Sequence, residues 1–313
     1  MRRRNFLKNA SLLTAGSVLA ANNHISAATT SVFKSNAKKS FGLQTWSLGN
    51  ELAPDVPGGL KKVAQMGYSY LELAGYNDGK IGAVPMAEFK KMADDVGLAI
   101  VSTHVNPPMR GYDKDNFEQA KEFWKKAADQ HAAIEVPYII QPGQPTTRSI
   151  EEVAFVGEVF NEAGKIAKAA GLQFAFHNHD GEFRRVVAGG TEMLPLTRGR
   201  APEGAKMVFD AMVEYTDPSL VQFELDVYWA VMGLQDPVAL MRKYPDRIRL
   251  LHIKDAAVLG ETGLMNFQKI FETAYENKID KFFVEYEANI PGLSRFEAVK
   301  LCAEYLTNAS FVR

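Results

Sequence analysis

The chain reads FAFHNH from Phe174 to His179, an apolar run that ends in polar side chains. Three later runs have the same form: VQFELD (Val221–Asp226), LLHIKD (Leu250–Asp255) and FFVEYE (Phe282–Glu287). Parallel strands are buried on both faces, and an unpaired His, Asp or Glu in the middle of such a sheet is costly. The four runs therefore indicate buried strands whose polar residues gather at their C-terminal ends.

Strand-like runs of this kind alternate with helical segments along most of the chain. The strand-like runs are Phe41–Leu48, Tyr68–Ala74, Leu98–Val105, Tyr138–Gln141, Gln173–His179, Val221–Asp226, Ile248–Asp255 and Lys281–Glu287. The helical segments are Gly58–Met66, Met86–Val96, Asn116–Ala133, Ile150–Ala170, Pro237–Tyr244, Asn266–Asn277 and Arg295–Leu306.

Eight strands separated by helices close a parallel barrel, so the pattern predicts an α/β protein with a single (β/α)8 TIM-barrel domain over residues 41–313. The rival fold is an open, doubly wound sheet. No G-x-G-x-x-G motif follows an early strand, which argues against its dinucleotide-binding form. The stretch Asp180–Lys206 is rich in Gly, Arg and Pro, and we expect it to form a loop and a short helix near the barrel mouth, the end where the strand C-termini meet.

The first residues have the pattern of an export signal. A twin-arginine sequence, RRNFLK at 3–8, precedes an apolar stretch at 11–21 and a small-residue cleavage site, SAA at 26–28. The apolar stretch is about half of the ~20 residues that a membrane-spanning helix needs. We expect a Tat-type signal peptide over 1–28, a leader over 29–40, and a periplasmic mature protein without a stable transmembrane segment.

The charge balance argues against a nucleic-acid partner. The chain has 36 Lys and Arg against 37 Asp and Glu, and four of the basic residues and none of the acidic ones lie in 1–28. The mature chain would therefore carry 32 − 37 = −5, which leaves no basic face for a phosphate backbone. A nuclease is excluded on this ground, and the single cysteine, Cys302, excludes an intramolecular disulfide.

Four of the six histidines lie at or beside predicted strand ends: His104, His177, His179 and His252. Side chains two residues apart in a strand share a face. His177 and His179 therefore point the same way, as do His252 and Lys254. Such a distribution points to a shared site at the barrel mouth.

Carboxylates follow the same rule on the next strands. Glu285 and Glu287 share a face, as do Glu224 and Asp226, of which Asp226 is nearer the strand end and is preferred as a site residue. Mixed carboxylate and imidazole ligands suit Mn²⁺, Zn²⁺, Co²⁺ or Fe²⁺ better than Ca²⁺. The alternative is a hydrogen-bonded network without a metal, but four strands that end in this way favour a metal site.

The sequence resembles the xylose-isomerase-like TIM barrels grouped as sugar phosphate isomerases/epimerases. The matching pieces are FHNHD (Phe176–Asp180), DVYW (Asp226–Trp229), LHIKD (Leu251–Asp255) and FVE (Phe283–Glu285). The resemblance covers roughly residues 41–306, and the motifs are specific to the superfamily only when they are taken together.

The resemblance implies one divalent metal, with Mn²⁺ the first choice, held at the ends of strands five to eight. The implied ligands are His177, Asp226, His252 and Glu285. His177 stands where many members have Glu, as in the related His-Asn-His subgroup, and this departure argues against a symmetric proton exchange between two carboxylates. His179 could replace His177 as the ligand.

The resemblance also implies reacting groups beside the metal. We expect His179 to act on the substrate. Lys254 is expected to be a general base or to stabilise an enolate, with a pKa lowered by burial, or else to form a structural salt bridge. Glu72 ends the second run and is a candidate acid or base that faces the mouth.

Four further residues are candidate substrate contacts. His104 ends the third run and would reach substrate hydroxyl groups, while Trp46 and Trp229 would offer flat walls to a sugar ring. Glu287 is a candidate substrate contact and could replace Glu285 as a metal ligand.

The expected function is that of a metal-dependent isomerase or epimerase. It would act through an enediolate on an unphosphorylated sugar or keto-sugar, since an exported enzyme has little access to sugar phosphates and no Gly-rich phosphate cradle is present. The rival activity is that of a lyase that cleaves 3-keto-glycosides by β-elimination. A different class is a non-catalytic, metal-dependent sugar-binding protein.

Overall fold

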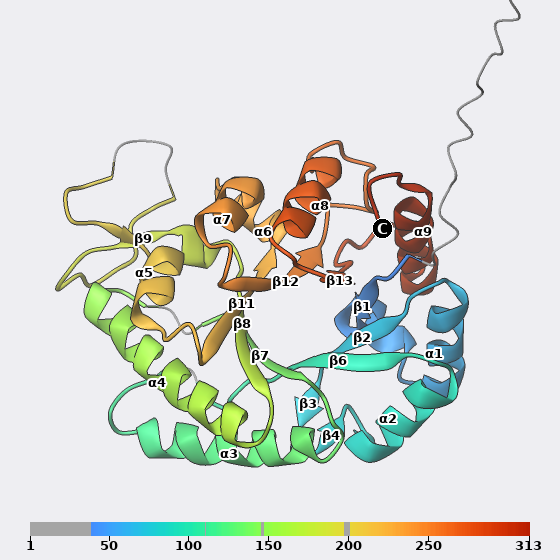
Figure 1. Cartoon of the computed structure of the whole chain (residues 1–313), viewed down its shortest axis with the longest axis horizontal. Helices are drawn as coiled ribbons and strands as arrows, with labels where there is room; N and C mark the ends of the chain where they lie inside the picture. Colours follow the sequence, from blue (N-terminus) through green and yellow to red (C-terminus); the bar gives the residue numbers. More distant parts are fainter. Residues whose placement is uncertain (1–38, 110, 145–146, 197–200) are drawn as a thin grey trace, which may run out of the picture. The chain divides into compact units, whose positions relative to one another are not determined.

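The computed structural model describes residues 39–109, 111–144, 147–196 and 201–313. Within them, eight parallel strands close into a barrel (Figure 1). In order around the barrel they are β1 (Gly42–Gln44), β13 (Lys281–Val284), β12 (Ile248–Ile253), β11 (Val221–Asp226), β8 (Gln173–His177), β7 (Tyr138–Pro142), β6 (Ala99–His104) and β2 (Tyr70–Leu73). The strand β1 pairs with both β13 and β2, which closes the sheet and confirms the predicted TIM barrel.

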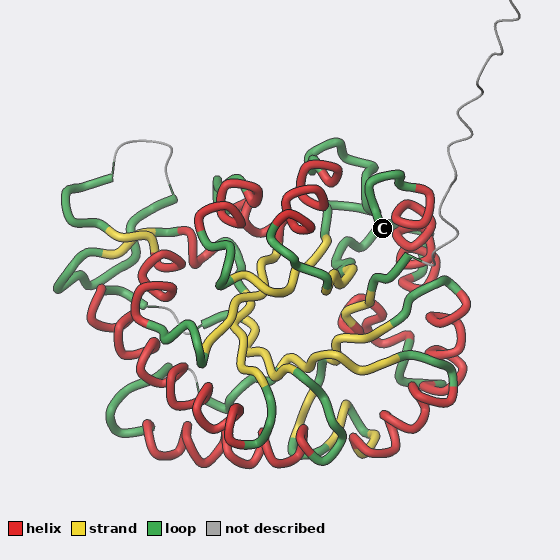
Figure 2. The backbone as a smooth tube through the Cα atoms, in the orientation of Figure 1, coloured by secondary structure: helices red, strands yellow, loops and turns green. Residues whose placement is uncertain are grey.

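Helices surround the barrel, as Figure 2 shows. Seven of them match the predicted helical segments to within two residues at each end: α1 (Val56–Gln65), α2 (Met86–Asp95), α3 (Phe117–Ala132), α4 (Ile150–Ala169), α7 (Pro237–Lys243), α8 (Phe267–Glu276) and α9 (Arg295–Asn308). Two more, α5 (Val208–Tyr215) and α6 (Val227–Met232), were not predicted.

The connections hold small elements beyond those predicted. The stretch Asp180–Lys206 contains the expected short helix, η2 (Gly181–Phe183), and the antiparallel pair β9 (Arg185–Val186) and β10 (Lys206–Met207). A 3-10 helix, η1 (Thr45–Glu51), follows β1, and a three-stranded sheet of β3 (Tyr76–Asn77), β4 (Lys80–Ile81) and β5 (Val84–Pro85) follows β2. The first predicted run is therefore a short strand followed by a helix.

The predicted signal peptide (1–28) lies outside the described residues, as does nearly all of the predicted leader (29–40). Among the helices that the structure describes, none is long and apolar enough to cross a membrane.

Inside the barrel, the strand residues form two tiers. The lower tier is a buried apolar cluster of Tyr70, Val101, Ile140, Ala175, Leu250 and Phe283. The upper tier is polar, and four of its members lie two residues after a member of the lower tier: Glu72, His177, His252 and Glu285. Alternate residues of a strand point to the same face, so the apolar tier forms the floor on which the polar tier rests.

We predict that Gly42 is required for the packing of this floor. A Cβ atom at Gly42 would lie 2.3 Å from Cδ2 of Tyr70 and 2.9 Å from Cδ1 of Phe283. Gly42→Ala should therefore lower the free energy of unfolding by about 1–3 kcal/mol, measured by urea denaturation. Gly181→Ala is the matched control, because no atom lies within 4 Å of a Cβ there. Equal stability of the two variants would refute the prediction.

Candidate metal centre and active site

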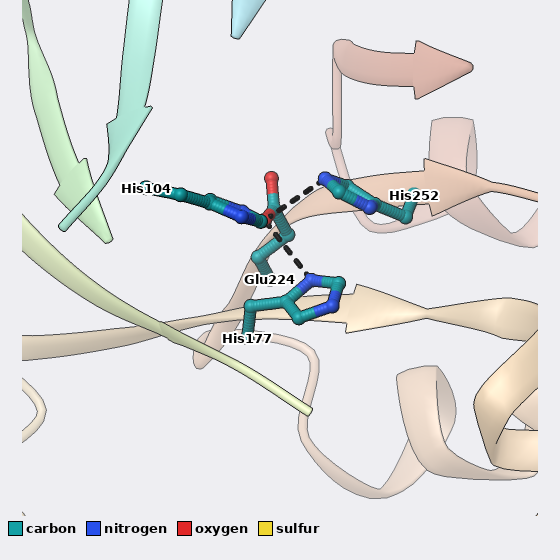
Figure 3. Close-up of side chains that lie close together, drawn as sticks. All are labelled: His104, His177, Glu224 and His252. Carbon is teal, nitrogen blue, oxygen red and sulfur yellow. Dashed lines mark hydrogen bonds and ion pairs between the residues drawn. The ribbon is translucent and has the colours of Figure 1, made fainter. Parts of the chain in front are cut away.

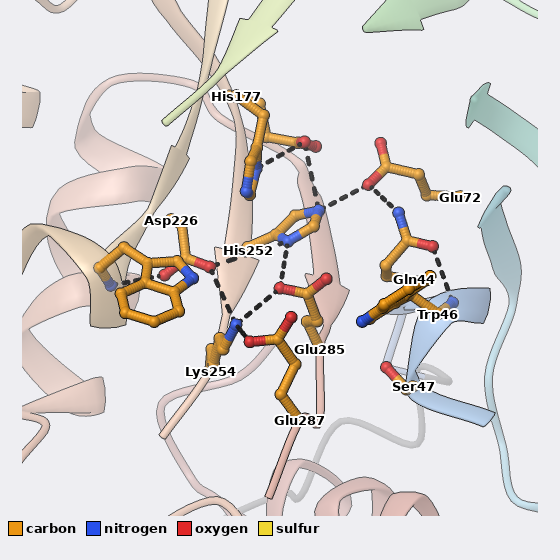
Figure 4. Close-up of polar contacts among 12 residues, drawn as sticks. Gln44, Trp46, Ser47, Glu72, His177, Asp226, His252, Lys254, Glu285 and Glu287 are labelled. Carbon is orange, nitrogen blue, oxygen red and sulfur yellow. Dashed lines mark hydrogen bonds and ion pairs between the residues drawn. The ribbon is translucent and has the colours of Figure 1, made fainter. Parts of the chain in front are cut away.

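Four polar side chains converge at the mouth from consecutive strands. His177 ends β8, Asp226 ends β11, His252 lies in β12 and Glu285 directly follows β13. One potential ligand atom from each lies within 4.8 Å of the others, and all four residues are buried. Nδ1 of His252 is 3.3 Å from Oε2 of Glu285 and 3.9 Å from Oδ2 of Asp226 (Figure 4). The structure thus brings together the four side chains that the sequence suggested as metal ligands.

The donor set fits a divalent metal ion. Oδ1 of Asp226 accepts the backbone N–H of Trp229 at the start of α6, whereas Oδ2 is buried and accepts no hydrogen bond. Burial raises the pKa of Asp226 to about 7. A buried carboxylate oxygen without a donor is costly unless a cation compensates it. Two carboxylates and two imidazoles suit Mn²⁺, Zn²⁺, Co²⁺ or Fe²⁺.

A second cluster centres on Glu224, which lies two residues before Asp226 in β11. Its Oε2 atom lies 3.2 Å from Nε2 of His104, from Nδ1 of His177 and from Nε2 of His252 (Figure 3). The three rings surround this one oxygen, and the four residues also have a spacing that could hold a metal. His177 and His252 therefore belong to both clusters.

Glu72 lies deep in the upper tier. It is fully buried, and it accepts hydrogen bonds from Nε2 of Gln44 at 2.8 Å and from Oγ of Ser102 at 2.6 Å. Its Oε1 is also 2.9 Å from Nε2 of His104 and 2.5 Å from Nε2 of His252. Burial raises the pKa of Glu72, but the two histidines lower it by more than burial raises it, so the pKa lies well below its ordinary value. These four neighbours enclose Glu72, and its expected role as an acid or base stays a prediction.

His104 is 9% exposed and stacks on His252, with ring centres 5.3 Å apart. Burial lowers the pKa of His104, whereas Glu72 and Glu224 raise it, and the result is a pKa of about 9. The ring is thus held between two carboxylates, and its expected contact with a substrate hydroxyl stays a prediction.

Lys254 lies among carboxylates and beside an aromatic ring. Its Nζ atom is 3.0 Å from Oε2 of Glu285, forms an ion pair with Glu287 and lies 4.7 Å from the centre of the Trp229 ring. Burial lowers the pKa of Lys254, but Asp226, Glu285 and Glu287 raise it above its ordinary value. The expectation of a lowered pKa was therefore wrong, because the neighbouring carboxylates outweigh burial. Lys254 is an ammonium group that can donate a proton.

His179 lies beside both the metal cluster and a tryptophan. Its ring centre is 5.0 Å from that of His177 and 5.7 Å from that of Trp229. Burial lowers the pKa of His179, so the ring is neutral at pH 7 and can accept a proton. Its backbone N–H donates to the buried Glu182 at 2.7 Å, which fixes the segment after β8.

The two predicted tryptophans differ in exposure. Trp46 lies in η1 and is 58% exposed, and Figure 4 shows it next to Gln44 at the edge of the site. Trp229 is partly buried in α6, and its Nε1–H is buried without an acceptor. The unpaired indole N–H suits a ligand oxygen, while the ring of Trp46 is free to stack on a ligand.

Sequence reasoning missed two buried members of the site, Gln44 and Ser102, and set a third, Glu224, aside in favour of Asp226. A signal existed for two of them, since Glu224 alternates with Asp226 and Ser102 alternates with His104. Preferring the residue nearest the strand end discarded Glu224, although both carboxylates of β11 point into the barrel.

Comparison with known proteins agrees with this architecture. The family described as "Xylose isomerase-like TIM barrel" matches residues 60–305. Two solved structures from Parabacteroides distasonis, both titled sugar phosphate isomerase/epimerase, are 46% and 44% identical, with TM-scores of 0.82 and 0.84. This chain covers all of each, and they cover 88% and 90% of this chain. A D-psicose 3-epimerase from Clostridium cellulolyticum shares the fold at 16% identity, with a TM-score of 0.66, over 88% of this chain and all of that one.

Curated relatives are more distant and match only in part. An inosose dehydratase from Clostridium tetani is 30% identical over 105 residues, which is 34% of this chain and 29% of the relative. Another, from Clostridium beijerinckii, is 26% identical over 180 residues, which is 50% of this chain and 54% of the relative. The match thus spans about a third to a half of these relatives. The fold and the family match together show that the chain belongs to the xylose isomerase-like TIM barrel family.

Proposed function

We propose that the protein is a divalent-metal-dependent enzyme that removes a proton from the carbon next to a ketone in an unphosphorylated sugar derivative. The observation that carries the proposal is the buried Oδ2 of Asp226, which accepts no hydrogen bond and lies 4.0 Å from Nζ of Lys254. It belongs to a cluster with His177, His252 and Glu285. A bound divalent ion would polarise the ketone oxygen and stabilise the enediolate that forms.

The acid and base beside this cluster are of different kinds. His179 is neutral and accepts the proton from carbon, whereas Lys254 is an ammonium group that donates one. Glu287 and Glu285 hold Lys254 in place, and the indole N–H of Trp229 can bind a substrate oxygen. Such an arrangement favours a reaction that runs in one direction.

We favour β-elimination as the outcome. A C–H bond breaks and its proton passes to His179; a C=C bond forms next to the ketone; the β C–O bond breaks, and the departing oxygen takes a proton from Lys254. His177 in place of a strand-five Glu also argues against a symmetric exchange between two carboxylates. The partial similarity to inosose dehydratases supports this choice, because dehydration is itself an elimination.

Isomerisation or epimerisation is the second candidate, supported by the similarity to the two Parabacteroides distasonis proteins, both described as sugar phosphate isomerase/epimerase. It shares the first step, after which Lys254 would return a proton to carbon instead of to a departing oxygen. A non-catalytic sugar-binding protein would use the same metal and the same tryptophans, and would tolerate the loss of His179 or Lys254.

The charges around the site support an unphosphorylated substrate. Among the residues proposed for the site, Lys254 is the only lysine or arginine, and its ammonium group is already paired with Glu285 and Glu287. A phosphate dianion would therefore face carboxylates. The twin-arginine pattern supports the same choice, since we propose that the protein is exported to the periplasm.

The metal proposal predicts a simple stoichiometry. The purified protein should contain about one divalent ion per chain by elemental analysis, and removal of that ion with a chelator should abolish activity. Asp226→Ala should lose both the ion and the activity, whereas Asp246→Ala, at an exposed position on the outside of the barrel, should keep both. A metal-free preparation with full activity would rule out the proposal.

The role of Lys254 can be separated from metal binding. Lys254→Met should retain the metal but lower turnover by a factor of about 10²–10⁴, the usual contribution of a general acid. The control is Lys243→Met, which removes a lysine that pairs with Asp210 on the outside of the barrel. Unchanged turnover in Lys254→Met would leave Lys254 with a structural role alone.

Product analysis in D₂O separates the candidate reactions. A 3-keto-glycoside should release its aglycone and give an unsaturated keto-sugar, since elimination expels the β-oxygen. A rearranged sugar that carries deuterium at carbon, without release of the aglycone, would instead establish isomerisation or epimerisation. Binding of the sugar without any conversion would establish the non-catalytic alternative.

A further inference from the structure

The two clusters share His177 and His252, yet they use opposite nitrogens of these rings. Nδ1 of His177 faces Glu224 at 3.2 Å, which leaves its Nε2 for the outer cluster. Nε2 of His252 faces Glu224 at 3.2 Å and Glu72 at 2.5 Å, while its Nδ1 faces Glu285. Each shared ring therefore has one nitrogen directed to the inner carboxylates and one directed to the proposed metal ligands (Figure 3 and Figure 4).

A neutral imidazole has one N–H group and one nitrogen lone pair. A ring that binds a metal ion through one nitrogen therefore carries its proton on the other. His177 and His252 cannot serve two metal ions at once in this form, so the inner and outer clusters must have different roles.

Access and hydrogen bonding assign those roles. The outer cluster adjoins the partly exposed Glu287, and its Asp226 has a buried oxygen without a donor. The inner cluster lies above the apolar floor, and Oε2 of Glu224 is within hydrogen-bonding distance of three ring nitrogens. Each cluster thus has one buried carboxylate oxygen without a donor, Oδ2 of Asp226 and Oε1 of Glu224. The outer cluster, however, adjoins the partly exposed mouth, whereas the inner one already faces three ring nitrogens.

The geometry points to Glu224 as the positioning residue of the metal centre. It accepts the N–H of His177 at Nδ1. Glu72 accepts the N–H of His252 at Nε2, and Oε2 of Glu224 lies 3.2 Å from the same nitrogen. The metal is then bound by Nε2 of His177 and by Nδ1 of His252. Glu72 is in turn held by Gln44 and Ser102, so the two rings rest on a fixed hydrogen-bonded base.

This role rests on the proposed metal dependence and adds a function for two carboxylates that no step of the proposed chemistry uses. A carboxylate that accepts the second N–H of a ligand histidine orients the ring and makes it a stronger donor to the metal. Hydrogen bonds to these carboxylates also reduce the cost of burying three imidazole rings in the barrel interior.

The test uses Zn²⁺ as the probe on the full chain. Affinity is measured by competition with a chelator, and the bound nitrogen of each histidine is identified by long-range ¹H–¹⁵N NMR. Glu224→Gln keeps the side-chain shape but removes the charge, so it should weaken Zn²⁺ binding by about 10–100-fold. Asp210→Asn is the control, because Asp210 pairs with Lys243 on the outside of the barrel. Its Zn²⁺ affinity should equal that of the wild type.

The NMR assignment on the wild type stands even where Glu224→Gln does not fold. We expect Zn²⁺ on Nε2 of His177 and on Nδ1 of His252, and the opposite pattern, or two Zn²⁺ ions per chain, would overturn the assignment. Unchanged affinity in a folded Glu224→Gln variant would overturn the role of Glu224 alone. A wild-type chain that binds no metal ion would overturn the proposed metal dependence, and with it this role.

Discussion

The structure depends on how the charge of four buried carboxylates is compensated. Glu72, Glu224, Asp226 and Glu285 all lie inside one barrel, above an apolar floor. Burying carboxylates of like charge together is unfavourable unless cations or N–H donors are placed among them. The histidines and Lys254 lie among them, yet two buried oxygens, Oδ2 of Asp226 and Oε1 of Glu224, accept no hydrogen bond, and Nζ of Lys254 is 4.0 Å from the first of these. That imbalance at the mouth is the physical reason to propose a divalent ion there.

The same imbalance organises the chemistry. The proposed base and acid are a neutral imidazole, His179, and a charged ammonium, Lys254, rather than a matched pair of carboxylates. An enzyme that moves a proton between two faces of a carbon benefits from two similar groups, and one that expels an oxygen benefits from a base and a separate acid. The substitution of His for Glu at the end of β8 and the raised pKa of Lys254 thus favour the same outcome.

The sequence was sufficient for the barrel and for the side chains at the strand ends. The alternation of side-chain direction along β8 and β12 predicted that His177 and His252 point into the barrel, and both are buried in the structure. Sequence reasoning preferred Asp226 to Glu224 by nearness to the strand end and could not assign a role to Glu224, because both face inward and only the closed barrel shows which oxygen the rings surround. Nor could it show that Glu72 is fully enclosed, since that depends on Gln44 and Ser102 from neighbouring strands. The pKa of Lys254 was misjudged because burial is visible in a sequence pattern, whereas the distances to three carboxylates are not.

The central claim is that one divalent ion binds at the ends of β8, β11, β12 and β13. A crystal structure of the protein grown with Mn²⁺ tests it most directly, through an anomalous difference map. We predict a single strong peak among His177, Asp226, His252 and Glu285. A map with no peak there, or with its peak between His104 and Glu224, would contradict the account.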